Sequence, residues 1–146
     1  MDDLTASGSF AVIDVDLTDI QSVDYEAQDT GYLGTYAASV TGNTTCVEAA
    51  AIGWTFTVND NDVDYLAAGQ TVTQKYDVTV SDGKGGTDTE TVTITITGTN
   101  DIPIIGAGTF TGAVTEIADL ASGANVDDLT ATGSFAVTDV DLTDIQ

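Results

Sequence analysis

Apolar and polar residues alternate with a period of two along three segments of the chain. The segments are residues 52–58 (IGWTFTV), 72–80 (VTQKYDVTV) and 91–97 (TVTITIT). In the last of them, Val92, Ile94 and Ile96 alternate with four threonines. Such alternation is typical of a strand with one buried and one solvated face. The pattern therefore predicts β-strands whose apolar side chains line a common core.

Weaker runs of the same kind predict further strands. They cover residues 9–13, 32–40, 109–114 and 134–137. The sequence DGKGG at 82–86 lies between two strong strands and is typical of a hairpin turn. A helical turn is indicated only at 113–121, where Val114, Ile117 and Leu120 follow a helical spacing. Six or seven short strands joined by polar turns indicate an all-β sandwich.

The two ends of the chain carry nearly the same sequence. Residues 2–21 (DDLTASGSFAVIDVDLTDIQ) and 127–146 (DDLTATGSFAVTDVDLTDIQ) are identical at eighteen of twenty positions. The offset is 125 residues, which is the length of a whole domain and not of a short solenoid unit. We therefore expect the chain to be a window from a tandem array of domains, with ends that do not fall on domain boundaries.

A boundary between successive repeats is expected near residue 101. GTND (98–101) follows the strongest predicted strand, and the one proline, Pro103, comes shortly after it. Proline cannot donate a ladder hydrogen bond, and it stiffens the exit of the chain. We assign residues 1–101 to most of one repeat that lacks its opening strand, and residues 102–146 to the front part of the next.

The two copies of the repeated segment are expected to compete for one position in the sandwich. Residues 2–21 should take it, because the loop that they close is shorter. Residues 102–126 carry the opening strand that the first sandwich lacks and are candidates to cover its exposed edge. The second copy, 127–146, then favours self-association by strand exchange between chains.

The composition excludes several classes of function. The chain has 24 acidic residues, two lysines, no arginine and no histidine, which gives a net charge of −22. This charge argues against nucleic-acid partners and anionic membranes, and no apolar run approaches the ~20 residues that span a bilayer. We expect no enzyme, because histidine is absent and no pair of carboxylates stands out. The 42% of hydrophobic residues favour a packed core over disorder.

Two stretches resemble a known family. VTVSDGKGGTDTETVTITITGTND (78–101) resembles the end of the VCBS-type and bacterial cadherin-like repeats of large secreted RTX-type adhesins. FAVTDVDLTD (135–144) resembles the early DxD segment of those repeats, whereas residues 22–70 fall outside the resemblance. The resemblance implies an immunoglobulin-like or cadherin-like antiparallel β-sandwich, stacked against neighbouring repeats on the bacterial cell surface, with calcium at the junctions.

Oxygen-bearing side chains occur where such junctions would need calcium ligands. Calcium takes 6–8 oxygen ligands from carboxylates, amides and backbone carbonyls. Asp139 and Asp141 follow a predicted strand, Asn100 and Asp101 lie in the linker, and Glu116 follows the next predicted strand. By resemblance to cadherin-type junctions, the first four share ions across the boundary, and Glu116 is an additional candidate.

Other acidic residues are candidates for a second junction. The resemblance assigns Asp14, Asp16 and Asp82 to the junction on the other side of the repeat, a site whose upstream partner is missing from this chain. A further acidic cluster, in NDNDVDYL at 59–66, is a weaker candidate and contains Asp60, Asp62 and Asp64. The alternative for every cluster is an acidic surface that only keeps the protein soluble.

Two functions of different classes follow from these observations. In the first, the repeat is a calcium-stabilised structural extender that holds a distal adhesive domain away from the cell. In the second, the repeat itself binds a sugar or protein receptor. An exposed aromatic cluster would favour the second function, and its candidate residues are Tyr25, Tyr32, Tyr36 and Tyr65. Repetition of the sequence favours the first.

Overall fold

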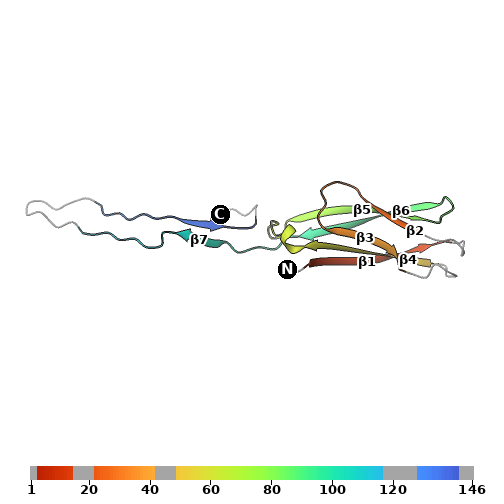
Figure 1. The fold of residues 1–146 in the computed structure, drawn as a ribbon, viewed down its shortest axis with the longest axis horizontal. Helices are drawn as coiled ribbons and strands as arrows, with labels where there is room; N and C mark the ends of the chain where they lie inside the picture. The colour runs from red at the N-terminus through yellow and green to blue at the C-terminus, as the bar shows by residue number, and fades with distance from the viewer. Residues whose placement is uncertain (1–2, 15–21, 42–48, 117–127, 142–146) are drawn as a thin grey trace, which may run out of the picture. The chain divides into compact units, whose positions relative to one another are not determined.

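The regular structure of the chain is almost entirely antiparallel β-sheet (Figure 1). The computed structural model describes residues 3–14, 22–41, 49–116 and 128–141, and no α-helix occurs in these ranges. Contacts divide the chain into two units: Met1–Asn100 together with Asp141–Gln146, and Asp101–Val140. The all-β prediction is confirmed, whereas the assignment of the chain to parts of two successive repeats stays a prediction.

The described residues of the first unit form six strands and one short 3-10 helix. They are β1 (Asp3–Ile13), β2 (Ser22–Ala27), β3 (Thr35–Val40), β4 (Ala49–Asn59), η1 (Asp60–Asp62), β5 (Thr71–Ser81) and β6 (Thr87–Thr97). The strands form two three-stranded antiparallel sheets, in the orders β1-β4-β3 and β2-β5-β6. These orders match strands B-E-D and C-F-G of a constant-type immunoglobulin sandwich, whose sheets are ABED and CFG. Strand A, which would lie beside β1, has no counterpart among the described residues of this unit.

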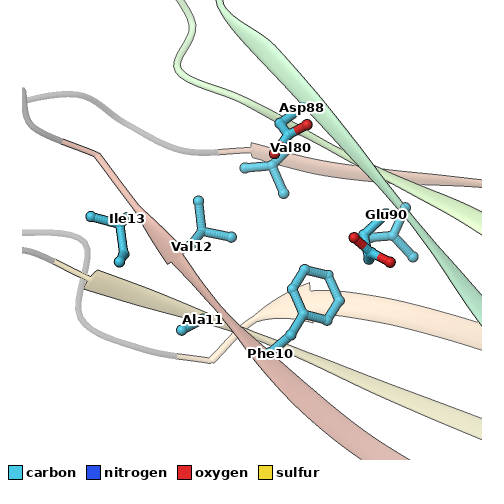
Figure 2. A pocket seen from close by; sticks show the side chains of 8 residues that line it. Phe10, Ala11, Val12, Ile13, Val80, Asp88 and Glu90 are labelled. Atoms are coloured by element: carbon cyan, nitrogen blue, oxygen red, sulfur yellow. The ribbon is translucent and has the colours of Figure 1, made fainter.

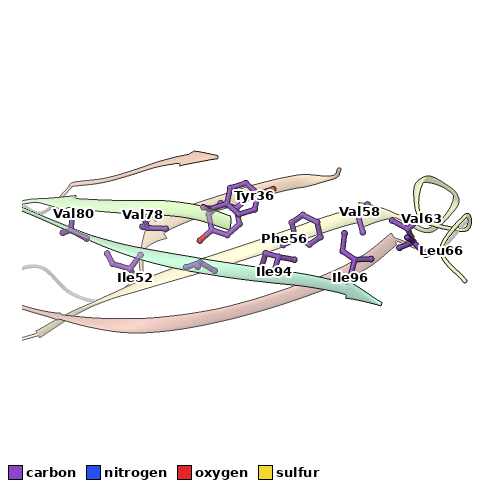
Figure 3. Close-up of a cluster of buried hydrophobic side chains, with 12 residues drawn as sticks. Tyr36, Ile52, Phe56, Val58, Val63, Leu66, Val78, Val80, Ile94 and Ile96 are labelled. Carbon is purple, nitrogen blue, oxygen red and sulfur yellow. The ribbon is translucent and has the colours of Figure 1, made fainter. Parts of the chain in front are cut away.

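The core of the sandwich is made by the alternating apolar positions that the sequence predicts (Figure 3). Ile52, Phe56 and Val58 extend from β4 toward the other sheet, and all three are buried. They meet a larger set of buried residues from β5 and β6, namely Tyr76, Val78, Val80, Val92, Ile94 and Ile96. Because each strand alternates its side chains between two faces, the intervening threonines lie on the outer faces.

Aromatic rings join the two sheets near the middle of the sandwich. Tyr36 of β3 stacks on Tyr76 of β5, with ring centroids 4.2 Å apart and planes 8° apart. Tyr25 and Tyr32 meet these rings in T-shaped, edge-to-face contacts, with centroids 5.4 Å from Tyr36 and 5.5 Å from Tyr76 respectively. Such aromatic pairs stabilise by ~0.5–1.5 kcal/mol beyond the burial of their area.

Where the structure describes the second unit, at 101–116 and 128–140, it forms one strand pair. β7 (Ile104–Gly108) pairs antiparallel with β8 (Phe135–Thr138), and the register is irregular between Ile105 and Gly108. Beyond the ladder, the backbone N–H of Thr109 donates to the carbonyl of Ser134. A two-stranded sheet has no second layer to cover its apolar side chains, so much of this unit's apolar surface lies exposed.

Several expectations about individual segments are corrected. Residues 109–114 form no strand, and 113–116 form no helical turn, while the rest of that predicted turn lies outside the described residues. β2 and β7 are strands that the pattern does not predict. β1 is longer than the predicted run at 9–13, and it takes its place beside β4 as expected for the first copy of the repeated segment. The predicted turn at 82–86 is confirmed between β5 and β6.

Candidate calcium-binding residues

One end of the first unit's sandwich carries a groove rimmed by carboxylates. The groove has a volume of about 360 Å³, and it is lined by the end of β1, the end of β5 and the start of β6. Asp14 and Asp82, both predicted from the sequence, lie on its lining. Asp88, which the sequence analysis missed, lies there as well. The fold therefore brings Asp14 to one groove with Asp82 and Asp88, two carboxylates of the β5–β6 hairpin that are distant from it in the sequence.

Asp82 has a structural role that the resemblance does not predict. Its Oδ1 accepts hydrogen bonds from the backbone N–H of Lys84 at 2.7 Å and of Gly86 at 2.9 Å. The first of these bonds does most to hold the pKa of Asp82 below its usual value, so the side chain stays anionic in mild acid. A side chain at position 86 would collide with the Asp82 carboxylate. Aspartate at the start of a glycine-rich turn is the sequence signal for this cap.

The second unit places two predicted ligands at one end of its strand pair. Ile104 lies opposite Thr138 in the ladder. Asp101 precedes Ile104 by three residues, and Asp139 directly follows Thr138. Both carboxylates therefore belong to the same end of the β7–β8 pair. Glu116 lies beyond the other end of the ladder and is exposed.

Of the remaining predicted junction residues, two belong to the first unit and one lies outside the described residues. Asn100 and Asp141 belong by their contacts to the first unit. Asp141 is only 3% exposed, which makes it the one buried carboxylate in the described part of the chain. Asp16 lies outside the described residues. That Asn100, Asp141 and Asp16 bind calcium together with the other candidates stays a prediction.

The acidic cluster at 59–66 forms the other end of the sandwich. Asp60 and Asp62 are exposed on η1, and the side chain of Asn59 caps this helix by accepting from the backbone N–H of Asn61 at 3.1 Å. The buried Val63 and Leu66 anchor the segment to the core. Across the described ranges, no three carboxylate or thiol side chains are grouped closely enough to hold a metal ion.

The tyrosines proposed as a receptor surface mainly serve the core. Tyr36 is 5% exposed, and Tyr32 and Tyr65 are half-buried against the core. Only Tyr25 exposes a large part of its ring, 42% of its surface. The aromatic side chains thus form an internal cluster and not a contiguous outer platform.

Comparisons with known proteins add no relatives. No protein-family model matches the chain, and no curated protein matches its sequence. Within the described ranges, no helix is both long enough and apolar enough to cross a membrane.

Proposed function

We propose that the chain is a calcium-stabilised structural extender from a large bacterial surface adhesin. In this role it contributes length and stiffness between the cell and a distal adhesive domain, and its partners are neighbouring repeats of the same chain. The observation that carries the proposal is the position of the acidic residues relative to the repeated segment. The VCBS-type and cadherin-like resemblance and the antiparallel sandwich support the same conclusion.

The repeat relates the acidic groups of the two units. An offset of 125 residues maps Asp139 onto Asp14 and Thr138 onto Ile13. In the second unit, the strand that lies opposite Thr138 is preceded by Asn100 and Asp101. In an array, the linker before each sandwich would therefore arrive where Asp14 and its groove lie, and ligands from two repeats would converge.

Calcium suits this convergence on physical grounds. Carboxylates brought together from two repeats repel each other. The chain has two lysines and no arginine, so basic side chains can offset little of this repulsion. A divalent cation with 6–8 oxygen ligands neutralises such a group without basic residues. Extracellular calcium modules bind with a Kd of ~10⁻⁴–10⁻³ M, which matches the high calcium outside cells.

A calcium titration of the melting temperature tests the proposal. With a Kd in the range above, ~10 mM calcium stabilises the bound state by about 1.4–2.7 kcal/mol. For a domain of this size, each kcal/mol raises the Tm by roughly 4–8 °C. Equal Tm values in chelator and in ~10 mM calcium, a concentration well above the expected Kd, would overturn the proposal.

Paired variants locate the site. The double variant Asp139→Asn, Asp141→Asn should reduce the calcium response, because it removes two predicted anionic ligands. Asp60→Asn is the surface control, because it removes a carboxylate from an exposed position at the η1 cluster, away from the predicted site. A control that reduces the response as strongly as the double variant would indicate nonspecific charge screening.

The alternative function, binding of a sugar or protein receptor by the repeat itself, has less support. Three of its four candidate tyrosines are buried or half-buried in the sandwich. Binding of this chain to a glycan array, abolished by Tyr25→Ala, would favour the alternative.

A further inference from the structure

The first unit has a strand edge and an apolar groove that lie side by side. β1 is an edge strand, because among the described residues it pairs only with β4. Next to it lies a groove of about 580 Å³ between β1 and the strands of the other sheet (Figure 2). Phe10 and Val12 face the floor of this groove, which is made by the core residues Val78 and Val80. A similar hollow continues along β1 past Leu4 and Ala6.

We propose that this edge and groove accept β7 from a second copy of the chain. The added strand would occupy the position of strand A in a constant-type immunoglobulin sandwich, antiparallel to β1. Addition of a strand to an exposed sheet edge is a common mode of recognition, in which backbone hydrogen bonds give affinity and side-chain pockets give specificity. This inference concerns the strand that completes the sandwich, and it does not rest on calcium binding.

The second unit shows the register of the added strand. β8 (Phe135–Thr138) is the repeat copy of Phe10–Ile13, with three of four residues identical. β7 pairs with β8 so that Ile105 lies opposite Val137 and Gly108 opposite Phe135. Subtraction of the 125-residue offset places Ile105 opposite Val12 and Gly108 opposite Phe10.

The side chains of β7 suit the groove in this register. Residues directly opposite each other in an antiparallel pair share one face, so Ile105 would point into the groove with Val12. Gly108 would leave room for Phe10. In the β7–β8 pair, a Cβ added at Gly108 would collide with Phe135, which is the repeat copy of Phe10. Residues 102–115 carry no charge, so the added strand avoids repulsion from Asp88 and Glu90 on the rim.

A chain cannot place its own β7 in this position. Ile104 would have to lie opposite Ile13, at the end of the sandwich where Thr87 begins β6. β6 runs from there to Thr97 over ten residue steps, or about 34 Å. The seven steps from Thr97 to Ile104 span at most about 25 Å when fully extended. The strand must therefore come from another chain.

The exchange is favourable because it keeps one ladder and gains burial. β7 would leave β8 and form an equivalent ladder on β1, so the backbone hydrogen bonds lost and gained would be nearly equal in number and free energy. Of the twelve large apolar residues that are exposed in the described part of the chain, nine lie in the second unit. Docking would bury Ile105 and Phe110, which are 61% and 64% exposed, against a sandwich core. This is the thermodynamic basis of domain swapping.

Sedimentation velocity of the full chain over a wide concentration range tests the proposal. We expect the 14.9 kDa monomer to convert to a species of twice that mass as the concentration rises. Ile105→Asp should weaken the dimer by ~100-fold or more, because it places a charge in the groove. Ile104→Asp is the matched control: the two isoleucines are almost equally exposed, but Ile104 would face outward beside Ile13. A chain that stays monomeric, or a dimer that responds equally to both variants, overturns the proposal.

Disulfide trapping tests the register independently of affinity. In a Cys46→Ser background, a chain with Val12→Cys is mixed with a chain that carries Ile105→Cys and is then oxidised. We expect a covalent heterodimer from this mixture, and none when Leu4→Cys replaces Val12→Cys. Absence of the heterodimer, or equal trapping by both cysteines, contradicts the register.

The trapping is repeated in chelator and in calcium at physiological ionic strength. A heterodimer in chelator supports strand addition even if the melting temperature is insensitive to calcium, so the two proposals fail separately. A chain that carries both Val12→Cys and Ile105→Cys should yield covalent dimers and not a disulfide within one chain. An internal disulfide would show that the strand comes from the same chain and would overturn the proposal.

Discussion

Gln74 is the buried polar residue on which the loop before β3 depends. It is 1% exposed in the middle of β5. Its Nε2 donates to the carbonyl of Leu33 at 3.0 Å, and its Oε1 accepts from the N–H of Leu33 at 2.5 Å. The amide side chain thus acts as a partner strand for one residue of the loop. Gln74→Leu keeps the volume but removes both bonds.

The expected loss of stability follows from the two backbone groups that would lose their partners. A buried donor or acceptor without a partner costs ~1–3 kcal/mol. Leu33 is half-buried, so water can reach part of its backbone, and the lower half of that range applies. With ~1–2 kcal/mol for each of the two groups, we expect Gln74→Leu to lower the free energy of unfolding by about 2–4 kcal/mol, and the Tm by roughly 8 °C or more.

Urea unfolding followed by fluorescence of the single tryptophan, Trp54, measures this change. Gln28→Leu is the matched control, because the side-chain amide of Gln28 is exposed and donates to the exposed carboxylate of Asp77, at 2.7 Å. Surface changes of this kind usually fall within about 0.5 kcal/mol. If Gln74→Leu also stays within about 0.5 kcal/mol of the unaltered chain, the two bonds to Leu33 do not stabilise the fold.

Three further predictions concern the core and one tight contact. Tyr36→Phe should raise the free energy of unfolding by ~1 kcal/mol in urea titrations, because the Tyr36 hydroxyl is buried and finds no hydrogen-bond partner among the described residues. Burial is the main cause, and the neighbouring tyrosines the second, of the rise in the pKa of Tyr36 from 10.0 to about 12. Because the folded state holds this proton more tightly than the unfolded state, the free energy of unfolding should fall between pH 10 and 12. The fall should be less steep in Tyr36→Phe, which lacks the titrating hydroxyl. Gly98→Ala should lower the free energy of unfolding by more than ~2 kcal/mol, because the new Cβ would collide with the carbonyl oxygen of Leu66. Gly106→Ala is its control and should lower the free energy of unfolding by less than ~1 kcal/mol, because a Cβ there would lie 3.5 Å from the Cβ of Ala136.

The strands that the sequence predicts correctly are those with a regular alternation of apolar residues. β4, β5 and β6 have one buried face each. Because side chains alternate between the two faces of a strand, their apolar residues recur at every second position in the sequence. β2 is not predicted, because it is an edge strand in which only Val23 is half-buried, and Asp24 and Glu26 are exposed acidic residues. β7 escapes because Pro103 and two glycines obscure its pattern.

Other features depend on partners that are remote in the sequence. Gln74 occupies a core position because of Leu33, which lies 41 residues away. The residues 109–114 alternate like a strand, but Phe110 stacks on Phe135 without a regular ladder. Asp88 lies among alternating threonines, and only the pairing of β5 with β6 brings it to the groove of Asp14. Local patterns carry no information about such contacts.

The two proposals have one structural origin in the strand that the first sandwich lacks. A strand that pairs with β1 in the register of β7 brings two things at once: apolar side chains for the groove, and the linker residues Asn100 and Asp101 for the end of the sandwich where Asp14 lies. Completion of the core and completion of the proposed ion site would then be coupled, because both would need the neighbouring segment. In an array, the stability of each repeat would contain a large term from its neighbour, as in other repeat proteins. Calcium would then stiffen the array by stabilising the sandwiches on both sides of a junction together with the linker between them.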